Sequence, residues 1–184
     1  DENRAQQGIR VGQIVAEQML AARVNDGWTV TPPAYSLPAT PGNWQPTSAA
    51  GAAFTHYPSV MPFAIASATQ FAPKPPPAMT SAQYAADLKE VKEIGSATSA
   101  TRTQDQTQVA QLWANVNTPT NFLLVWNNVA RTVSDARNLT TVQKARLFAL
   151  TNMALHDALQ TTFASKFQHG MWRPVTAIRR ADED

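Results

Sequence analysis

Two basic residues near the carboxyl end of the chain stand at a spacing that could bind an anion. Six residues, including Gly170, separate Lys166 from Arg173, and Pro174 follows directly after the arginine. Gly170 allows the chain to turn, and Pro174 suits the first position of a new helix and keeps Arg173 out of helical geometry. We therefore expect Lys166 at the end of one helix and Arg173 just before the next. Two permanent cations that converge there suit a tetrahedral oxyanion.

Three neighbours are candidates to surround such an anion. Trp172 could form a wall of the site or stack on a guanidinium, and the amides at the start of the new helix would add positive potential. His169 could donate a hydrogen bond to the anion, although a structural role explains it at least as well. For Asp157 we favour a buried structural role, with Arg173 or a backbone amide as its partner, over a role in tuning the site.

The remaining candidates give weaker patterns. His156 precedes Asp157, but adjacent helical residues point about 100° apart and do not face each other. His156 also lacks a second histidine three or four residues away, so the sequence predicts no metal site made of this chain's residues alone. His56 is interpreted as structural, and the tryptophans Trp113, Trp126 and Trp172 are predicted to be core rather than a cofactor box.

The elements that must position these residues fall into three stretches of one incomplete domain. Residues 1–26 show apolar residues at helical spacing, which predicts a helix. Residues 27–79 form a proline-rich arm: 11 of the 13 prolines lie between positions 27 and 86, where Lys74 is the only formally charged side chain. Its aromatic content predicts an arm that lies pinned across another surface in extended or polyproline form, with a partly ordered loop as the alternative.

Residues 80–184 read as successive helices that end in the Lys166–Arg173 segment. Their starts are marked by side chains at capping spacing: Thr80 with Gln83, Thr103 with Gln106, Thr118 before Pro119, and Thr140 with Gln143. No stretch alternates as a strand would, and the connections are short. The sequence therefore predicts an all-α fold, an antiparallel helical bundle with a long proline-rich irregular arm.

Composition excludes several classes of function. Charged residues make up 15% of the chain and the net charge is +2, so we expect no nucleic-acid partner. The chain has no cysteine, and no apolar run is long enough for a membrane span. It opens on Asp1 without an initiator methionine, which is typical of a processed or trimmed product. We expect a periplasmic or secreted protein, with a cytoplasmic one left open.

The segment Lys166 to Pro174 resembles the first signature motif shared by vanadium-dependent haloperoxidases and the type-2 phosphatidic acid phosphatase superfamily. Its flanks extend the likeness over most of the chain. The stretches "EVKEIGSATSATRTQDQTQVAQLW", "ARLFALTNMALHDA" and "MWRPVTAIRRADED" resemble consecutive helices of the bacterial haloperoxidase-like branch. The stretches "ARVNDGW" and "PGNWQPT" fit its upstream part.

The resemblance implies that Lys166 and Arg173 hydrogen-bond the oxygens of vanadate, or of phosphate in its place. The family needs two further motifs, a Pro-Ser-Gly-His segment and a Ser-Arg segment followed by a histidine. The stretch "YPSV" lacks Gly-His, and no Ser-Arg pair occurs in the sequence. The chain therefore resembles the N-terminal part of such an enzyme, with no catalytic residue of its own, and we expect no turnover from it alone.

Three functions follow as alternatives. The first is oxidation of halide by hydrogen peroxide at bound vanadate, completed by the C-terminal half of the same protein. The second is hydrolysis of a phosphoester, as in acid or phosphatidic acid phosphatases. The third is a non-catalytic helical binding or scaffold domain whose arm wraps a partner, and a homodimer is compatible with such an arm. Without the resemblance, Lys166 and Arg173 would read as ordinary surface charges.

Overall fold

The computed structural model describes residues 2–116 and 119–180, and over these residues the all-α prediction is confirmed. The helices are α1 (Glu2–Arg23), α2 (Ala82–Gly95), α3 (Gln104–Val116), α4 (Pro119–Ala136), α5 (Thr141–His169) and α6 (Pro174–Arg179), with a 3-10 turn η1 (Tyr57–Ser59). The expected helix over 1–26 ends slightly early, at Arg23, and α5 runs past the expected end near Lys166 to His169.

Two of the predicted capping boxes are confirmed. The Thr103 amide donates to Gln106 Oε1 at 2.9 Å, and Thr103 Oγ1 accepts from the Gln106 amide at 3.2 Å. Thr140 and Gln143 make the same reciprocal pair at the start of α5, at 2.9 and 3.4 Å. These bonds satisfy amides that have no partner within the helix, so they fix where α3 and α5 begin.

The third predicted box, Thr80 with Gln83, is wrong by one residue. Ser81 is the N-cap of α2, and its hydroxyl accepts from the Tyr84 amide at 3.2 Å. Serine and threonine cap equally well, so the sequence offers two adjacent candidates and the preceding chain decides between them. The predicted N-cap Thr118 lies outside the described residues.

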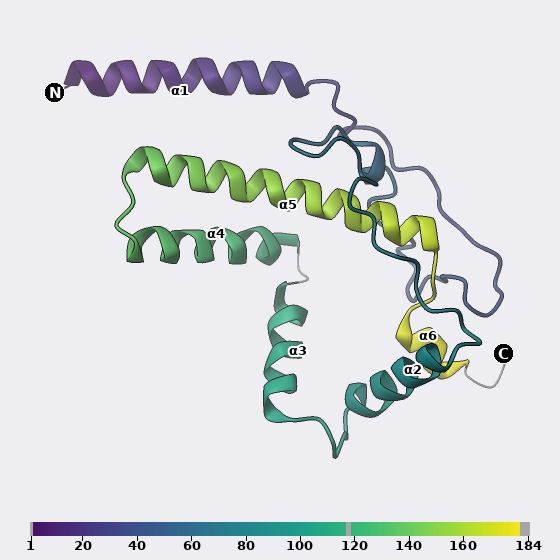
Figure 1. Cartoon of the computed structure of the whole chain (residues 1–184). Coiled ribbons are helices and arrows are strands. Elements are labelled where there is room, and N and C mark those ends of the chain that lie inside the picture. The colour runs from purple at the N-terminus through teal and green to yellow at the C-terminus, as the bar shows by residue number, and fades with distance from the viewer. Residues whose placement is uncertain (1, 117–118, 181–184) are drawn as a thin grey trace.

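The arm between α1 and α2 is largely irregular and passes beside α5 (Figure 1). Side chains of α1 and α5 hold it. At the end of α1, the Arg23 guanidinium donates to the carbonyl of Pro62 at 3.0 Å and to that of Met61. From α5, Gln160 Nε2 donates to the carbonyl of Val60. The arm is therefore pinned across a surface, as its apolar composition predicted.

The helices pack in pairs along a chain that folds back on itself. α4 and α5 lie antiparallel, α3 contacts α4, and α2 contacts the short α6 (Figure 1). The buried apolar residues are Trp44, Tyr57, Val60, Ala130, Ala164, Trp172 and Ala177. Most of them come from the arm, the carboxyl half of α5 and α6, so the core sits beside the Lys166–Arg173 segment.

Several apolar stripes that the sequence predicts to be buried are exposed to solvent instead. α1 contributes no buried residue, and it projects from the rest of the molecule (Figure 1). Of the three tryptophans predicted as core, Trp172 is 5% exposed, but Trp113 is 51% and Trp126 is 37% exposed. The prediction is therefore right for Trp172 and wrong for the other two, because helical periodicity shows that a face is apolar and not what covers it.

None of the helices in the described part of the chain is both long and apolar enough to cross a membrane.

Candidate oxyanion site

Lys166 lies in the last turn of α5, where the helix stops at a left-handed glycine. Gly170 has φ 52° and ψ 27°, and its amide donates to the Lys166 carbonyl at 3.0 Å. A residue without a Cβ adopts this conformation at little cost, which is why glycine ends so many helices. The turn predicted from Gly170 is confirmed, and it directs the chain from α5 toward α6.

The Lys166 ammonium packs over two aromatic rings of its own helix. Its nitrogen lies 5.3 Å from the ring centre of Phe163 and 5.6 Å from that of Phe167. Partial burial lowers the pKa of Lys166, because removing water disfavours the charged form, and the positive charge of Arg173 lowers it further. The two cations are thus close enough to repel each other.

Arg173 stands directly before α6, as predicted. Its backbone is extended, with φ −75° and ψ 151°, and Pro174 occupies the first turn of the helix. The amides of Thr176 and Ala177 donate to the Arg173 carbonyl, so these two donors are already used. The additional positive potential expected from this helix start is therefore small, since α6 has only six residues.

Neither cation has a carboxylate partner within residues 2–116 and 119–180. The ion pairs found there join Arg23 to Asp26, Lys89 to Glu93 and Lys144 to Asp135. Two neighbouring cations that lack a counter-charge favour an anion between or beside them. Lysine offers a compact charge and arginine a planar fork of donors, a combination that suits the oxygens of phosphate or vanadate.

The turn between the two cations is held by distant segments. The Trp44 amide donates to the Gly170 carbonyl at 2.6 Å, and the Trp172 amide donates to the Gly42 carbonyl at 2.8 Å. On the other side, Trp172 Nε1 donates to the Tyr84 hydroxyl of α2 at 2.8 Å. Trp172 is therefore built into the packing between α2 and α6, and the cation–π contacts found among the described residues do not include it.

Asp157 anchors the arm to α5 through backbone amides, one of the two kinds of partner that the sequence left open. Its carboxylate accepts from the amides of Phe63, Ala64 and Ile65 at 2.8, 2.7 and 3.1 Å. Burial alone would raise the pKa of Asp157, but the three amides and the nearby His156 outweigh it and hold the pKa below its usual value. This carboxylate is therefore ionised, and it holds the arm against α5.

The three histidines lie in different surroundings. His156 Nδ1 lies 3.1 Å from the Tyr57 hydroxyl, and its Nε2 is buried with no hydrogen-bond partner among the described residues. His56 contacts the ring of Trp28 in the arm. His169 ends α5 one turn after Lys166 and is partly buried. In the described part of the chain, no three histidine or acidic side chains are grouped to hold a metal ion.

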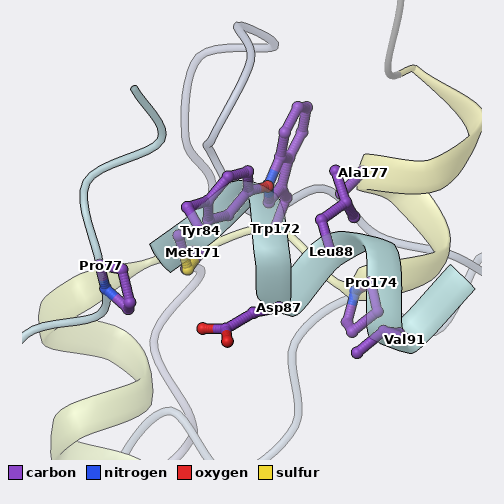
Figure 2. Close-up of a pocket in the computed structure, with 9 residues that line it drawn as sticks. All are labelled: Pro77, Tyr84, Asp87, Leu88, Val91, Met171, Trp172, Pro174 and Ala177. Atoms are coloured by element: carbon purple, nitrogen blue, oxygen red, sulfur yellow. The ribbon is translucent and has the colours of Figure 1, made fainter. Parts of the chain in front are cut away.

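An apolar hollow lies next to Trp172, where α2 meets the turn and the start of α6 (Figure 2). It has a volume of about 170 Å³ and is lined by Pro77, Tyr84, Asp87, Leu88, Val91, Met171, Trp172, Pro174 and Ala177. Tyr84 and Trp172 lie side by side at one end, whereas the Asp87 carboxylate points away from the tryptophan (Figure 2). Lys166 and Arg173 are absent from its lining, so the hollow is separate from the cationic pair.

The residues that hold the turn between Lys166 and Arg173 are not predicted from the sequence. The sequence patterns do not predict that Tyr84, Gly42 and Trp44 contact the turn. Their partners Gly170 and Trp172 lie far along the sequence. The "PGNWQPT" stretch was the available signal, because its resemblance to the haloperoxidase-like branch marked this part of the arm.

Two comparisons with known proteins gave a match. A model of the VCPO second helical-bundle domain matches residues 146–184, which include both cations. The crystal structure of the first bacterial vanadium-dependent iodoperoxidase superposes with a TM-score of 0.76 at 29% sequence identity, covering 92% of this chain and 44% of that one. This chain thus spans less than half the length of that structure.

The search of curated proteins gave no significant match. The two positive comparisons are nevertheless independent, since one rests on sequence around the cationic pair and the other on the fold of nearly the whole chain. By both measures, the chain is similar to part of a vanadium haloperoxidase-like protein.

Proposed function

We propose that this chain is the oxyanion-holding part of a vanadium-dependent haloperoxidase-like enzyme, in which Lys166 and Arg173 bind vanadate. The observation that supports it best is the pair itself. Lys166 and Arg173 lie on the segment that matches the family, the charge of Arg173 contributes to the lowered pKa of Lys166, and neither has a carboxylate partner among the described residues. An oxyanion would relieve their repulsion.

Each residue would act on the anion through charge-assisted hydrogen bonds. The Lys166 ammonium has three donors, and the Arg173 guanidinium has a fixed planar set that can contact two oxygens at once. The rings of Phe163 and Phe167 beneath Lys166 reduce its contact with water, which strengthens its attraction for an anion. The two side chains would balance the negative charge and orient the oxygens.

Bound vanadate would supply the Lewis-acid centre at which peroxide oxidises halide. The residues of this chain fit the anion's oxygens, but no histidine stands beside the two cations at a matching motif position. We infer that the group bonded to vanadium comes from a second segment, the C-terminal half of the same protein. Such a partner would also cover apolar side chains that are exposed here, including Trp113 and Trp126.

Hydrolysis of a phosphoester is the second candidate, because the same two cations would stabilise a phosphoryl transition state. The similarity to an iodoperoxidase over 92% of the chain favours vanadate. A purely structural binding domain is less well supported, because it gives no role to two cations that lack a carboxylate partner among the described residues.

The test is a calorimetric titration of orthovanadate, and separately of phosphate, into the protein that carries this chain together with its C-terminal half. Arg173→Ala should weaken vanadate binding about 10- to 100-fold, since hydrogen bonds to charged groups contribute roughly 1.5–3 kcal/mol each. Lys166→Ala should have a similar effect.

Arg146→Ala is the matched control, because Arg146 is an exposed arginine on the same helix, far from the turn. The vanadate affinity of the Arg146→Ala variant should equal that of the unchanged protein. Unchanged affinity in Arg173→Ala, or no vanadate binding by the complete protein, would overturn the proposal. Tighter binding of phosphate than of vanadate would move the assignment to the phosphoester candidate.

A further inference from the structure

The turn between Lys166 and Arg173 has little structure of its own. Residues 170–173 connect α5 to α6 and belong to neither helix, and an isolated antiparallel bridge joins Met171 to Asn43 of the arm. We propose that the arm segment 35–44 and the Tyr84 hydroxyl form a two-sided clamp that positions Arg173 relative to Lys166. The clamp concerns the same anion site and so rests on the proposed function.

The arm holds the first half of the turn through its backbone. Trp44 donates to Gly170 and Trp172 donates to Gly42, at 2.6 and 2.8 Å. These two bonds flank the bridge at Met171, so the turn pairs with the arm as a short strand would. The residues that separate the two cations are thereby fixed by a segment more than a hundred positions earlier in the chain.

Side chains of the arm also press directly on Gly170. A Cβ atom on this glycine would lie 2.5 Å from Leu37 Cδ1 and 2.8 Å from the Tyr35 hydroxyl oxygen. The Tyr35 hydroxyl in turn donates to the Phe167 carbonyl at 3.3 Å, and its ring centre lies 4.9 Å from that of Phe167. The arm therefore contacts both the turn and the residue next to Lys166.

Helix α2 holds the second half of the turn through one side-chain bond. Trp172 is 5% exposed, and its indole nitrogen donates to the Tyr84 hydroxyl at 2.8 Å. Figure 2 shows the two rings next to each other, where α2 meets the turn. Because Arg173 is the next residue, a shift of Trp172 would carry the arginine with it.

The clamp matters because the binding of one anion by two cations depends on their separation. Lys166 is fixed by its own helix, but Arg173 has no carboxylate within the described residues to hold it. Like charges tend to move apart unless the backbone prevents it. The clamp supplies this restraint before the anion binds, which reduces the cost of ordering the site.

The experiment uses Tyr84→Phe, Tyr35→Phe and the double variant, each of which removes a hydroxyl and keeps the ring. The first readout is the pKa of the Lys166 ammonium, followed by NMR with 13C-labelled lysine and with Lys144 as internal reference. Arg173→Gln sets the scale, because removing the neighbouring charge should raise the pKa of Lys166. The clamp variants should shift it in the same direction, and the double variant most.

The second readout is orthovanadate affinity in the protein completed by its C-terminal half. The single variants should bind about 2- to 12-fold more weakly, the range that corresponds to one neutral hydrogen bond. Tyr57→Phe is the matched control. It removes a tyrosine hydroxyl whose partner is His156 and not the turn, so it should leave both readouts unchanged.

The outcomes separate the clamp from the proposed function. If Arg173→Gln shifts the pKa of Lys166 but the double clamp variant does not, the clamp is refuted. If Tyr57→Phe shifts it as much as the clamp variants do, the effect is a general loss of packing and the clamp is refuted as well. If the clamp variants shift the pKa but the unchanged protein binds no vanadate, the clamp stands and the proposed function falls.

Discussion

The two long helices α1 and α5 differ in how far their side chains are buried. α5 buries Asp157, Gln160 and Ala164 against an irregular, proline-rich arm. α1 has 22 residues and buries none of them, although apolar side chains such as Val11 and Leu20 lie along it at 61% and 73% exposure. Regular structure and burial are therefore separate properties in this protein.

The difference follows from how each segment satisfies its backbone. A helix bonds its own amides and carbonyls, so α1 can remain ordered without a covering surface. An irregular segment can be buried only where other parts of the chain or water supply the missing partners. Asp157 and Gln160 supply them for residues 60–65 of the arm, and the site beside Lys166 lies on this covered end.

Removing the Asp157 carboxylate, which holds the arm against α5, should have the largest effect on stability. Asp157→Ala leaves the buried amides of Phe63, Ala64 and Ile65 without their acceptor. We expect a loss of about 3 kcal/mol or more in the free energy of unfolding, because each unmet buried donor is costly. Urea denaturation followed by circular dichroism measures it.

Asp157→Asn is the control for this change. It keeps one acceptor oxygen of the same shape, so it should lose less stability than the alanine variant. Equal stability of Asp157→Ala and the unchanged chain would show that the arm is not anchored by this carboxylate.

A smaller effect should appear on acidification. The pKa of Asp157 is lowered in the folded chain from its usual 3.8, so the folded state favours the ionised carboxylate. Its contribution to stability is complete above that value, and it declines as the pH falls from about 3.8 through the lowered folded pKa. The free energy of unfolding against pH should fall over this window, and it should fall less steeply in Asp157→Asn. Parallel curves for the two proteins would contradict the assignment.

Exposed and buried apolar side chains offer a further contrast. Val60, in the arm, is 2% exposed, and Val60→Ala should destabilise the chain by roughly 2 kcal/mol. Leu20→Ala on α1 should change the free energy of unfolding by less than about 0.5 kcal/mol, because nothing in the structure covers this side chain. Thermal unfolding of both variants at two protein concentrations measures the difference. A large, concentration-dependent loss in Leu20→Ala would show that α1 is covered by a second copy.

Much of the site could be predicted because its signals are local. The Gly170 turn, the extended Arg173 and the start of α6 at Pro174 all follow from residues within a few positions of one another. Tyr84, Gly42 and Leu37 were not predicted as its neighbours, because nothing in their own surroundings distinguishes them. The exposure of Trp113 and Trp126 was missed for a related reason, since a helical stripe does not reveal whether another element covers it.

The sequence by itself determined where α3, α5 and α6 begin, that the chain turns at Gly170, and that a lysine and an arginine flank this turn. Capping, glycine geometry and proline geometry act over a few residues, so they can be read directly from the chain. Only the tertiary structure decided which surfaces are buried and how the turn is held. Those outcomes depend on contacts such as that from Tyr35 to the Phe167 carbonyl, 132 positions apart, and such contacts exist only once the chain has folded.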